Sequence, residues 1–161
     1  MFGGMRMHDV FGLFGAIGKV RTEPSGFCLR FDAQIEGTAP RRLYYRTQNS
    51  QQMLGLLLPE NGVLQLRGKC PLKCFDAGGV FTTTRRRWQP MRALDGGRII
   101  PHAVETQLDD CTCIAFAYTT LLPQQVMPYF CFLSVGDIEG EFCWYLHCDK
   151  ARMPIFRELS L

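Results

Sequence analysis

Eight cysteines and three histidines are the side chains of this chain with the most obvious chemistry, because they bind metals and act as nucleophiles and bases. A structural zinc site commonly brings two pairs of Cys or His ligands into one tetrahedron. Cys70 and Cys74 have a suitable spacing and lie in an expected turn, Cys-Pro-Leu-Lys-Cys. They are the candidate metal ligands. Most of the cysteines are better interpreted as small, buried hydrophobic residues.

The second half of a zinc site would have to come from a segment such as Cys143-Trp-Tyr-Leu-His-Cys148. Neighbouring side chains on an extended strand point to opposite faces, so His147 and Cys148 would not reach the same ion. No local signature joins a cysteine to a histidine as nucleophile and base, and no catalytic residue is predicted. A zinc protein or a thiol enzyme is therefore kept only as an alternative, and no cofactor is expected.

An arginine run followed by a tryptophan is the second group with possible chemistry. Arg85, Arg86 and Arg87 precede Trp88, in a chain of formal net charge +3 whose basic residues are mostly arginine. Guanidinium groups bind phosphates and an indole stacks on a base, so these four residues could bind nucleic acid or another anionic polymer. The favoured interpretation is an exposed strand edge whose charges prevent aggregation.

Length and composition limit the class of protein. A chain of 161 residues that is 47% hydrophobic and 20% charged is typical of a globular protein with one domain or two small ones. The apolar run at 10–17 is too short to span a bilayer, and the N-terminus lacks the features of a signal peptide. We therefore expect a cytoplasmic protein with reduced thiols and no membrane span.

Strand signals dominate the first half of the sequence. The segment 27–36 alternates strictly, with Phe27, Phe31 and Ile35 among the residues on the face predicted to be buried. Further strands are predicted at 43–47, 53–58, 63–67 and 80–84, with Pro-Glu-Asn-Gly at 59–62 closing a hairpin between the second and third of these.

The second half is less regular. We predict a short strand at 98–100 and a weak helix at 102–108, and the apolar segment 111–122 fits either a strand or a helix, with its composition favouring a strand. The segments 129–135 and 141–147 read as a hairpin whose strands are buried on both faces. Its turn is either Glu139-Gly140 or the five residues 136–140.

Part of the chain resembles an uncharacterised all-β module of clostridial proteins. The resemblance spans about residues 18–84 and consists of Gly18-Lys-Val20, Gly26-Phe-Cys-Leu-Arg-Phe31, Leu54-Gly-Leu-Leu-Leu-Pro-Glu60 with Gly62, and Leu66 with Lys69-Cys-Pro-Leu72. It implies a bacterial protein with a small β unit and implies no activity. The module's usual ending is shorter and less basic than 81–88 of this chain.

These patterns together predict an all-β protein, an antiparallel sandwich or partly open barrel with at most one or two short helices. The expected organisation is an apolar, Gly-rich segment at 1–16, a β module at 17–84, an Arg-rich connection at 85–97 and a second β-rich portion at 98–161. The function expected first is a non-enzymatic interaction module that binds a protein partner or a second copy of itself. Phe11, Leu13 and Phe14 are the candidate contact residues.

Overall fold

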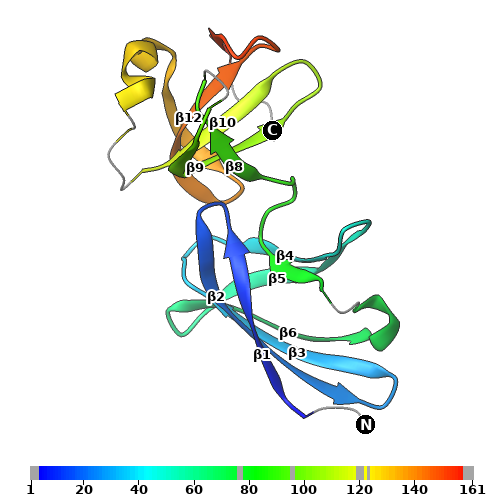
Figure 1. Ribbon diagram of the computed structural model, residues 1–161. Helices are drawn as coiled ribbons and strands as arrows, with labels where there is room; N and C mark the ends of the chain where they lie inside the picture. Colours follow the sequence, from blue (N-terminus) through cyan, green and yellow to red (C-terminus); the bar gives the residue numbers. More distant parts are fainter. Residues whose placement is uncertain (1–3, 76–77, 95–96, 119–121, 123, 158–161) are drawn as a thin grey trace. The chain divides into compact units, whose positions relative to one another are not determined.

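The computed structural model describes residues 4–75, 78–94, 97–118, 122 and 124–157, and it confirms the all-β class. The chain divides into two compact units, Met1–Arg85 and Arg86–Leu161. The N-terminal unit is a closed β-barrel and the C-terminal unit is an open sheet (Figure 1). No helix among the described residues is long and apolar enough to cross a membrane.

Seven strands form the barrel, in the order β1-β2-β3-β6-β5-β4-β7. All neighbouring pairs are antiparallel except β1 and β7, which close the barrel as a parallel pair through Val10↔Phe81 and Phe11↔Thr82. The strands are β1 (Arg6–Gly12), β2 (Gly15–Ser25), β3 (Cys28–Ile35), β4 (Arg41–Arg46), β5 (Gln51–Glu60), β6 (Val63–Pro71) and β7 (Val80–Thr82), and a 3₁₀ turn, η1 (Leu72–Cys74), follows β6. Most of the segment expected at 1–16 is thus part of the barrel, and its residues 1–3 lie outside the described range.

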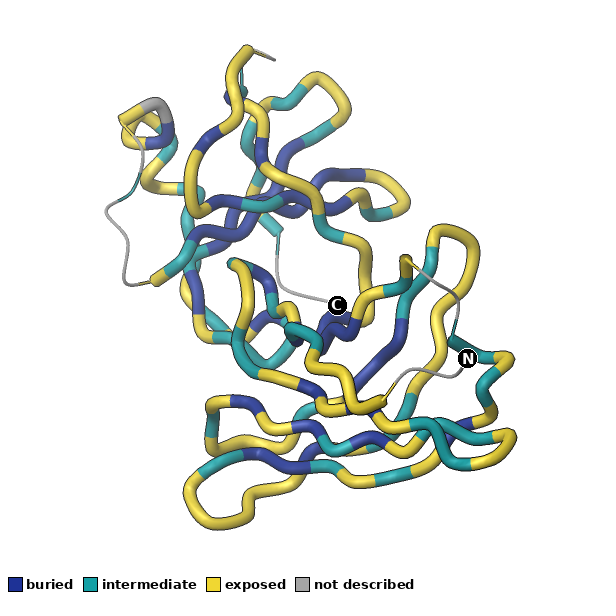
Figure 2. The backbone as a smooth tube through the Cα atoms, turned by 60° about the horizontal axis from the view of Figure 1, so that its bottom comes forward, coloured by how far each residue is buried: buried dark blue, intermediate teal, exposed yellow. Residues whose placement is uncertain are grey.

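The barrel interior follows from the alternation in the sequence. Buried and exposed residues alternate along the barrel strands (Figure 2). In β3, Phe31, Ala33 and Ile35 are buried, while Arg30 and Gln34 are exposed. The prediction that Phe27 faces the core is wrong. Phe27 lies in the β2–β3 turn and is 94% exposed. The other buried hydrophobic residues of the barrel core are Val10, Val20, Leu43, Tyr45, Leu57, Leu64, Cys70 and Phe81.

The predicted hairpin of β5 and β6 is confirmed. Glu60 pairs with Val63, so Asn61 and Gly62 form a two-residue turn with φ angles of 52° and 83°. Asn and Gly are the residues that accept this left-handed conformation at the lowest cost.

The C-terminal unit is a sheet in the order β11-β12-β10-β9-β8, with β13 pairing to the far end of β12. Its strands are β8 (Gln89–Arg92), β9 (Ile99–Gln107), β10 (Thr112–Ala117), β11 (Ser134–Ile138), β12 (Glu141–Cys148) and β13 (Pro154–Ile155). A 3₁₀ segment, η2 (Gln124–Phe132), precedes β11, and its Val126 belongs to the core of this unit. The connection expected at 85–97 therefore contains a strand, β8; residues 95–96 lie outside the described range.

Two predicted elements in this unit are wrong. The helix at 102–108 is instead part of β9, because the β-branched Val104 and Thr106 pair with Ala115 and Cys113 of β10. The strand at 129–135 is mostly the 3₁₀ segment η2, which contains Pro128 and places Val126 in the core. In both places pairing or packing with distant residues outweighs a weak local pattern.

Two alternatives in this unit are resolved. The ambiguous segment 111–122 contains strand β10, although its residues 119–121 lie outside the described range. Ile138 pairs with Glu141, so the hairpin turn is Glu139-Gly140, with φ angles of 56° and 84°. Strand β12 is buried on both faces over its second half, as predicted, with Tyr145, His147 and Cys148 all inaccessible.

Candidate anion-binding site

The arginine run crosses the boundary between the two units. The Arg85 carbonyl accepts a hydrogen bond from the Gln51 amide at 2.8 Å within the barrel unit. In the C-terminal unit, the Arg86 N–H donates to the Glu139 carboxylate at 3.2 Å, and the Thr106 hydroxyl donates to the Arg87 carbonyl at 2.8 Å. Two side chains of the C-terminal unit, Glu139 and Thr106, therefore fix the backbone of Arg86 and Arg87.

Arg86 and Arg87 line a depression of about 380 Å³ in the C-terminal unit. The other lining residues are Gln89, at the start of β8, and Glu105, Thr106 and Gln107, at the end of β9. Gln89 pairs with Glu105, so Thr106 and Gln107 lie beyond the stretch of β9 that β8 covers. Thr106 and Gln107 are held in turn by β10, through Cys113 and Thr112.

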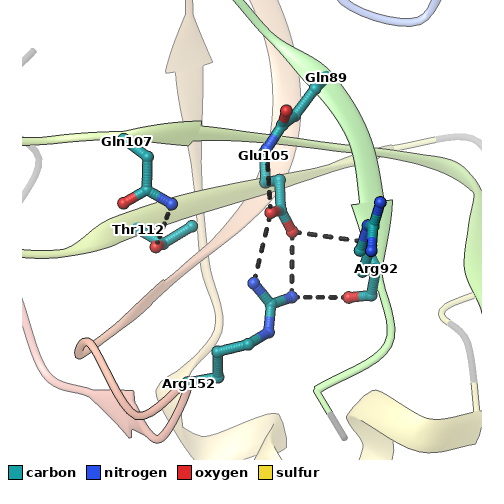
Figure 3. Close-up of polar contacts among 6 residues, drawn as sticks. All are labelled: Gln89, Arg92, Glu105, Gln107, Thr112 and Arg152. Carbon is teal, nitrogen blue, oxygen red and sulfur yellow. Dashed lines mark hydrogen bonds and ion pairs between the residues drawn. The ribbon is translucent and has the colours of Figure 1, made fainter. Parts of the chain in front are cut away.

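Glu105 is the one carboxylate in this depression, and it is already engaged (Figure 3). Its oxygens accept two hydrogen bonds from the Arg152 guanidinium, at 3.0 and 3.3 Å. They also accept the Arg92 backbone N–H at 3.3 Å and the Gln89 amide at 3.4 Å. The forked Arg152 guanidinium is therefore the counter-ion of the Glu105 carboxylate, and Arg86 and Arg87 are the cations among the residues that line the depression.

The remaining polar groups of the site are neutral. The Gln107 amide donates to the Thr112 hydroxyl at 2.9 Å, which orients the Gln107 side chain along the sheet (Figure 3). Trp88, the fourth predicted residue, is half-buried, and its indole N–H has no hydrogen-bond partner among the described residues. Two of the four predicted residues, Arg86 and Arg87, therefore share one depression.

The buried cysteines Cys113, Cys143 and Cys148 of this unit are poor nucleophiles. Burial, together with the neighbouring Cys143 and Cys111 thiols, raises the pKa of Cys113 to about 12, while Arg86 acts in the opposite direction. Burial likewise raises the pKa of Cys143 to about 12 and that of Cys148 to about 11. These three thiols are protonated at neutral pH, and a protonated thiol is a poor nucleophile.

The predicted metal ligands Cys70 and Cys74 lie at the end of β6 and in η1 of the barrel. Burial raises the pKa of Cys70, and the nearby Cys74 thiol raises it further. Among the described residues, no group of three or more His, Cys, Asp or Glu side chains could hold a metal ion. His147 pairs with Cys113 and Cys148 pairs with Thr112, so His147 and Cys148 face opposite sides of β12.

The predicted contact residues do not form one surface. Phe11 in β1 is exposed and Phe14 is half-buried. Leu13 is only 4% exposed, so its assignment to an interaction surface is wrong. An apolar run at a strand end supplies barrel packing as readily as a docking surface.

The sequence did not identify Glu105, Thr106, Gln107 and Arg152 as site residues. The first three lie in the segment predicted to be helical, and Arg152 lies in a turn, with a φ of 61°, close in sequence to the end of β12. One signal was present in the sequence, a glutamate between the β-branched residues Val104 and Thr106. A glutamate in a strand that packs against a core needs a cation as its partner.

Comparisons of the whole chain with models of protein families, with curated proteins and with solved structures gave no match.

Proposed function

We propose that the C-terminal unit binds a phosphate-bearing ligand of about nucleotide size in the depression lined by Arg86 and Arg87. One observation carries the proposal: Arg86 and Arg87 line the same depression, and Glu105, the carboxylate among its described lining residues, is paired with Arg152. Guanidinium groups bind phosphate oxygens in a forked, bidentate geometry. The volume of about 380 Å³ lies in the range of small-ligand sites.

The neutral lining residues favour a ligand with polar edges in addition to its phosphate. Gln89 and Gln107 each present an amide beside the arginines. The amide groups of Gln89 and Gln107 are oriented by hydrogen bonds to Glu105 and Thr112. An oriented amide offers a donor and an acceptor at fixed positions, which suits a nucleobase edge.

Titration calorimetry with ADP tests the proposal on the full chain. We expect saturable binding that weakens as salt rises, and Arg86→Ala and Arg87→Ala each weakening it by about tenfold, since a charge-assisted hydrogen bond contributes about 1.5–3 kcal/mol. Arg98→Ala, an exposed arginine of the same unit, is the matched control. Binding that is unchanged in both site variants, or equally weakened by the control, contradicts the proposal.

A second candidate function, self-association, is favoured by a different observation in the same unit. Tyr118, Phe130 and Phe142 are each about half exposed, with exposed fractions of 49%, 54% and 57%. Tyr118 lies 5.0 Å from Phe142 and 5.7 Å from Trp144, and Phe130 lies 6.4 Å from Trp144, measured between ring centroids. Clustered exposed aromatic rings are typical of protein contact surfaces.

Sedimentation velocity over a range of concentrations tests self-association. We expect a concentration-dependent dimer that Phe142→Ser converts to a monomer, while Phe156→Ser, which changes an exposed phenylalanine outside this cluster, leaves it intact. A monomer at every concentration contradicts this second proposal.

A further inference from the structure

The outer face of the barrel carries a second basic depression, of about 580 Å³, over strands β2, β3 and β6. Arg21, Arg30, Arg67 and Lys69 line it together with Glu23 and Asp32. Strand pairing brings these residues together in two rows, Arg21–Asp32–Arg67 and Glu23–Arg30–Lys69. The charges of these six side chains sum to +2, because four are cations and two are carboxylates.

The two rows differ in how their charges are balanced. Asp32 lies between two cations, with Arg67 at 3.4 Å and Arg21 at 3.8 Å. Arg30 and Lys69 are directly opposite each other on β3 and β6. Within the part of the chain that the structure describes, neither has a hydrogen bond or ion pair through its side chain. Like charges directly opposite each other destabilise a sheet, and an anion bound between them would remove that cost.

A fully exposed aromatic ring stands at the end of the same strands. Ser25 pairs with Cys28, so Gly26 and Phe27 form the β2–β3 turn, and Gly26 has a φ of 63°. The Leu72 N–H donates to the Phe27 carbonyl at 2.9 Å, which fixes the turn against the segment after β6. Phe27 is 94% exposed in this fixed turn, three residues before Arg30.

We infer that this face of the barrel binds single-stranded nucleic acid, with Arg30, Lys69 and Arg67 contacting phosphates and Phe27 stacking on a base. A basic groove combined with exposed aromatic rings is the usual arrangement for such binding. The cations surround a hollow, which a flexible strand can enter and a flat bilayer surface cannot follow. Stacking on Phe27 requires an unpaired base, which favours a single strand over a duplex. This inference is independent of the depression at Arg86 and Arg87.

Fluorescence anisotropy of a labelled oligothymidine of about 12 nucleotides, titrated with the full chain at several salt concentrations, tests the inference. We expect affinity to fall as salt rises, with the slope against log salt reduced by about 0.7 for each phosphate contact removed. The double charge reversal Arg30→Glu with Lys69→Glu should weaken binding at least tenfold. Phe27→Ala should weaken it about fivefold or more, as expected for one lost base stack.

The matched control reverses two exposed charges in the other unit, Arg98→Glu with Lys150→Glu. Thermal unfolding of each variant separates lost binding from lost folding, and Phe27→Ala keeps the net charge unchanged. The inference is overturned if the control weakens binding as much as the barrel variant, if duplex or heparin binds more tightly than the single strand, or if only phosphatidylserine vesicles bind. Binding that is lost in Arg86→Ala while the barrel variants still bind would assign the oligonucleotide to the C-terminal depression and overturn the inference.

Discussion

The two units differ in whether their sheets have free edges. In the barrel, every strand has a neighbour on both sides, and the parallel pair of β1 and β7 completes the circle. In the C-terminal unit, the sheet is open and β8 and β11 are its edges. An open edge leaves backbone groups available, and a following or preceding segment can be fixed there by hydrogen bonds.

This difference determines how each unit presents positive charge. The barrel presents Arg30 and Lys69 by strand alternation alone, since each lies on the outer face of a paired strand. The C-terminal unit presents Arg86 and Arg87 from an irregular segment, which Thr106 and Glu139 hold through its backbone. The closed sheet therefore presents its charges in a depression over three paired strands, whereas the open sheet presents them in a smaller depression beside the end of a strand.

The largest expected effect tests how tightly the barrel is closed. An added Cβ at Gly18 would lie 2.2 Å from the backbone oxygen of Gln34 and 2.6 Å from the Ile35 Cα. Because backbone atoms must move, we expect Gly18→Ala to destabilise the barrel by about 3 kcal/mol or more. Urea denaturation measures this, and Gly4→Ala, where an added Cβ meets nothing within 4 Å, should be neutral. Equal stability of the two variants would show that β2 and β3 are less closely packed than described.

The corresponding test in the open sheet removes the cation from Glu105. Arg152→Ala leaves the buried Glu105 carboxylate with only its contacts to Arg92 and Gln89. Loss of one partner of a buried ion pair costs about 3–5 kcal/mol, and we expect about 2–3 kcal/mol because the Arg152 side chain is 23% exposed. Arg98→Ala is the control, and denaturation followed by tryptophan fluorescence reports on this unit, because Trp88 and Trp144 both lie in it. If Arg152→Ala loses less stability than Arg98→Ala, the ion pair between Arg152 and Glu105 does not stabilise this unit.

A smaller effect is expected where the arginine segment is attached to β9. Thr106→Val keeps the shape of the side chain and removes the hydrogen bond from its hydroxyl to the Arg87 carbonyl. We expect a loss of stability of about 1 kcal/mol, together with weaker binding of ADP to the full chain. Thr38→Val, at an exposed position of the barrel unit, should change neither quantity. Binding that is unaffected by Thr106→Val would mean that the attachment does not position Arg87.

The smallest expected effect is a dependence on pH. Burial lowers the pKa of His147 below its ordinary value of 6.5; Arg157 lowers it further and Asp110 acts in the opposite direction. The unfolded chain therefore binds this proton more readily than the folded chain, so stability decreases as the pH falls through about 6.5. His147→Gln should reduce this decrease in urea midpoints measured between about pH 7.5 and about pH 5.5. An unchanged pH slope in His147→Gln would contradict the assignment.

The barrel was largely predictable from the sequence because its strands alternate clearly. The segment 27–36 and the Asn61-Gly62 turn have local signals strong enough to define strand and register. Phe27 was misplaced because alternation does not reveal where a strand gives way to a turn. Closure through β1 and β7 was not predictable, since it depends on a parallel pair about seventy residues apart in the sequence.

The candidate site was only half predictable. The arginine run and its neighbouring tryptophan are visible in the sequence, and two of its residues line the depression. Glu105 and Gln107 belong to a strand whose local pattern is weakly helical and which forms by pairing with β10. Arg152 reaches Glu105 from a turn 47 residues further along the chain, a contact that no local pattern encodes.

The central claim is that Arg86, Arg87 and the end of β9 form one anion-binding site, and an NMR titration of the full chain with pyrophosphate tests it most directly. We predict saturable shifts of the backbone amides of Arg86, Arg87, Thr106 and Gln107 that are lost when both arginines are replaced by alanine. Shifts that are absent, or that spread evenly over exposed arginines such as Arg98, would contradict it.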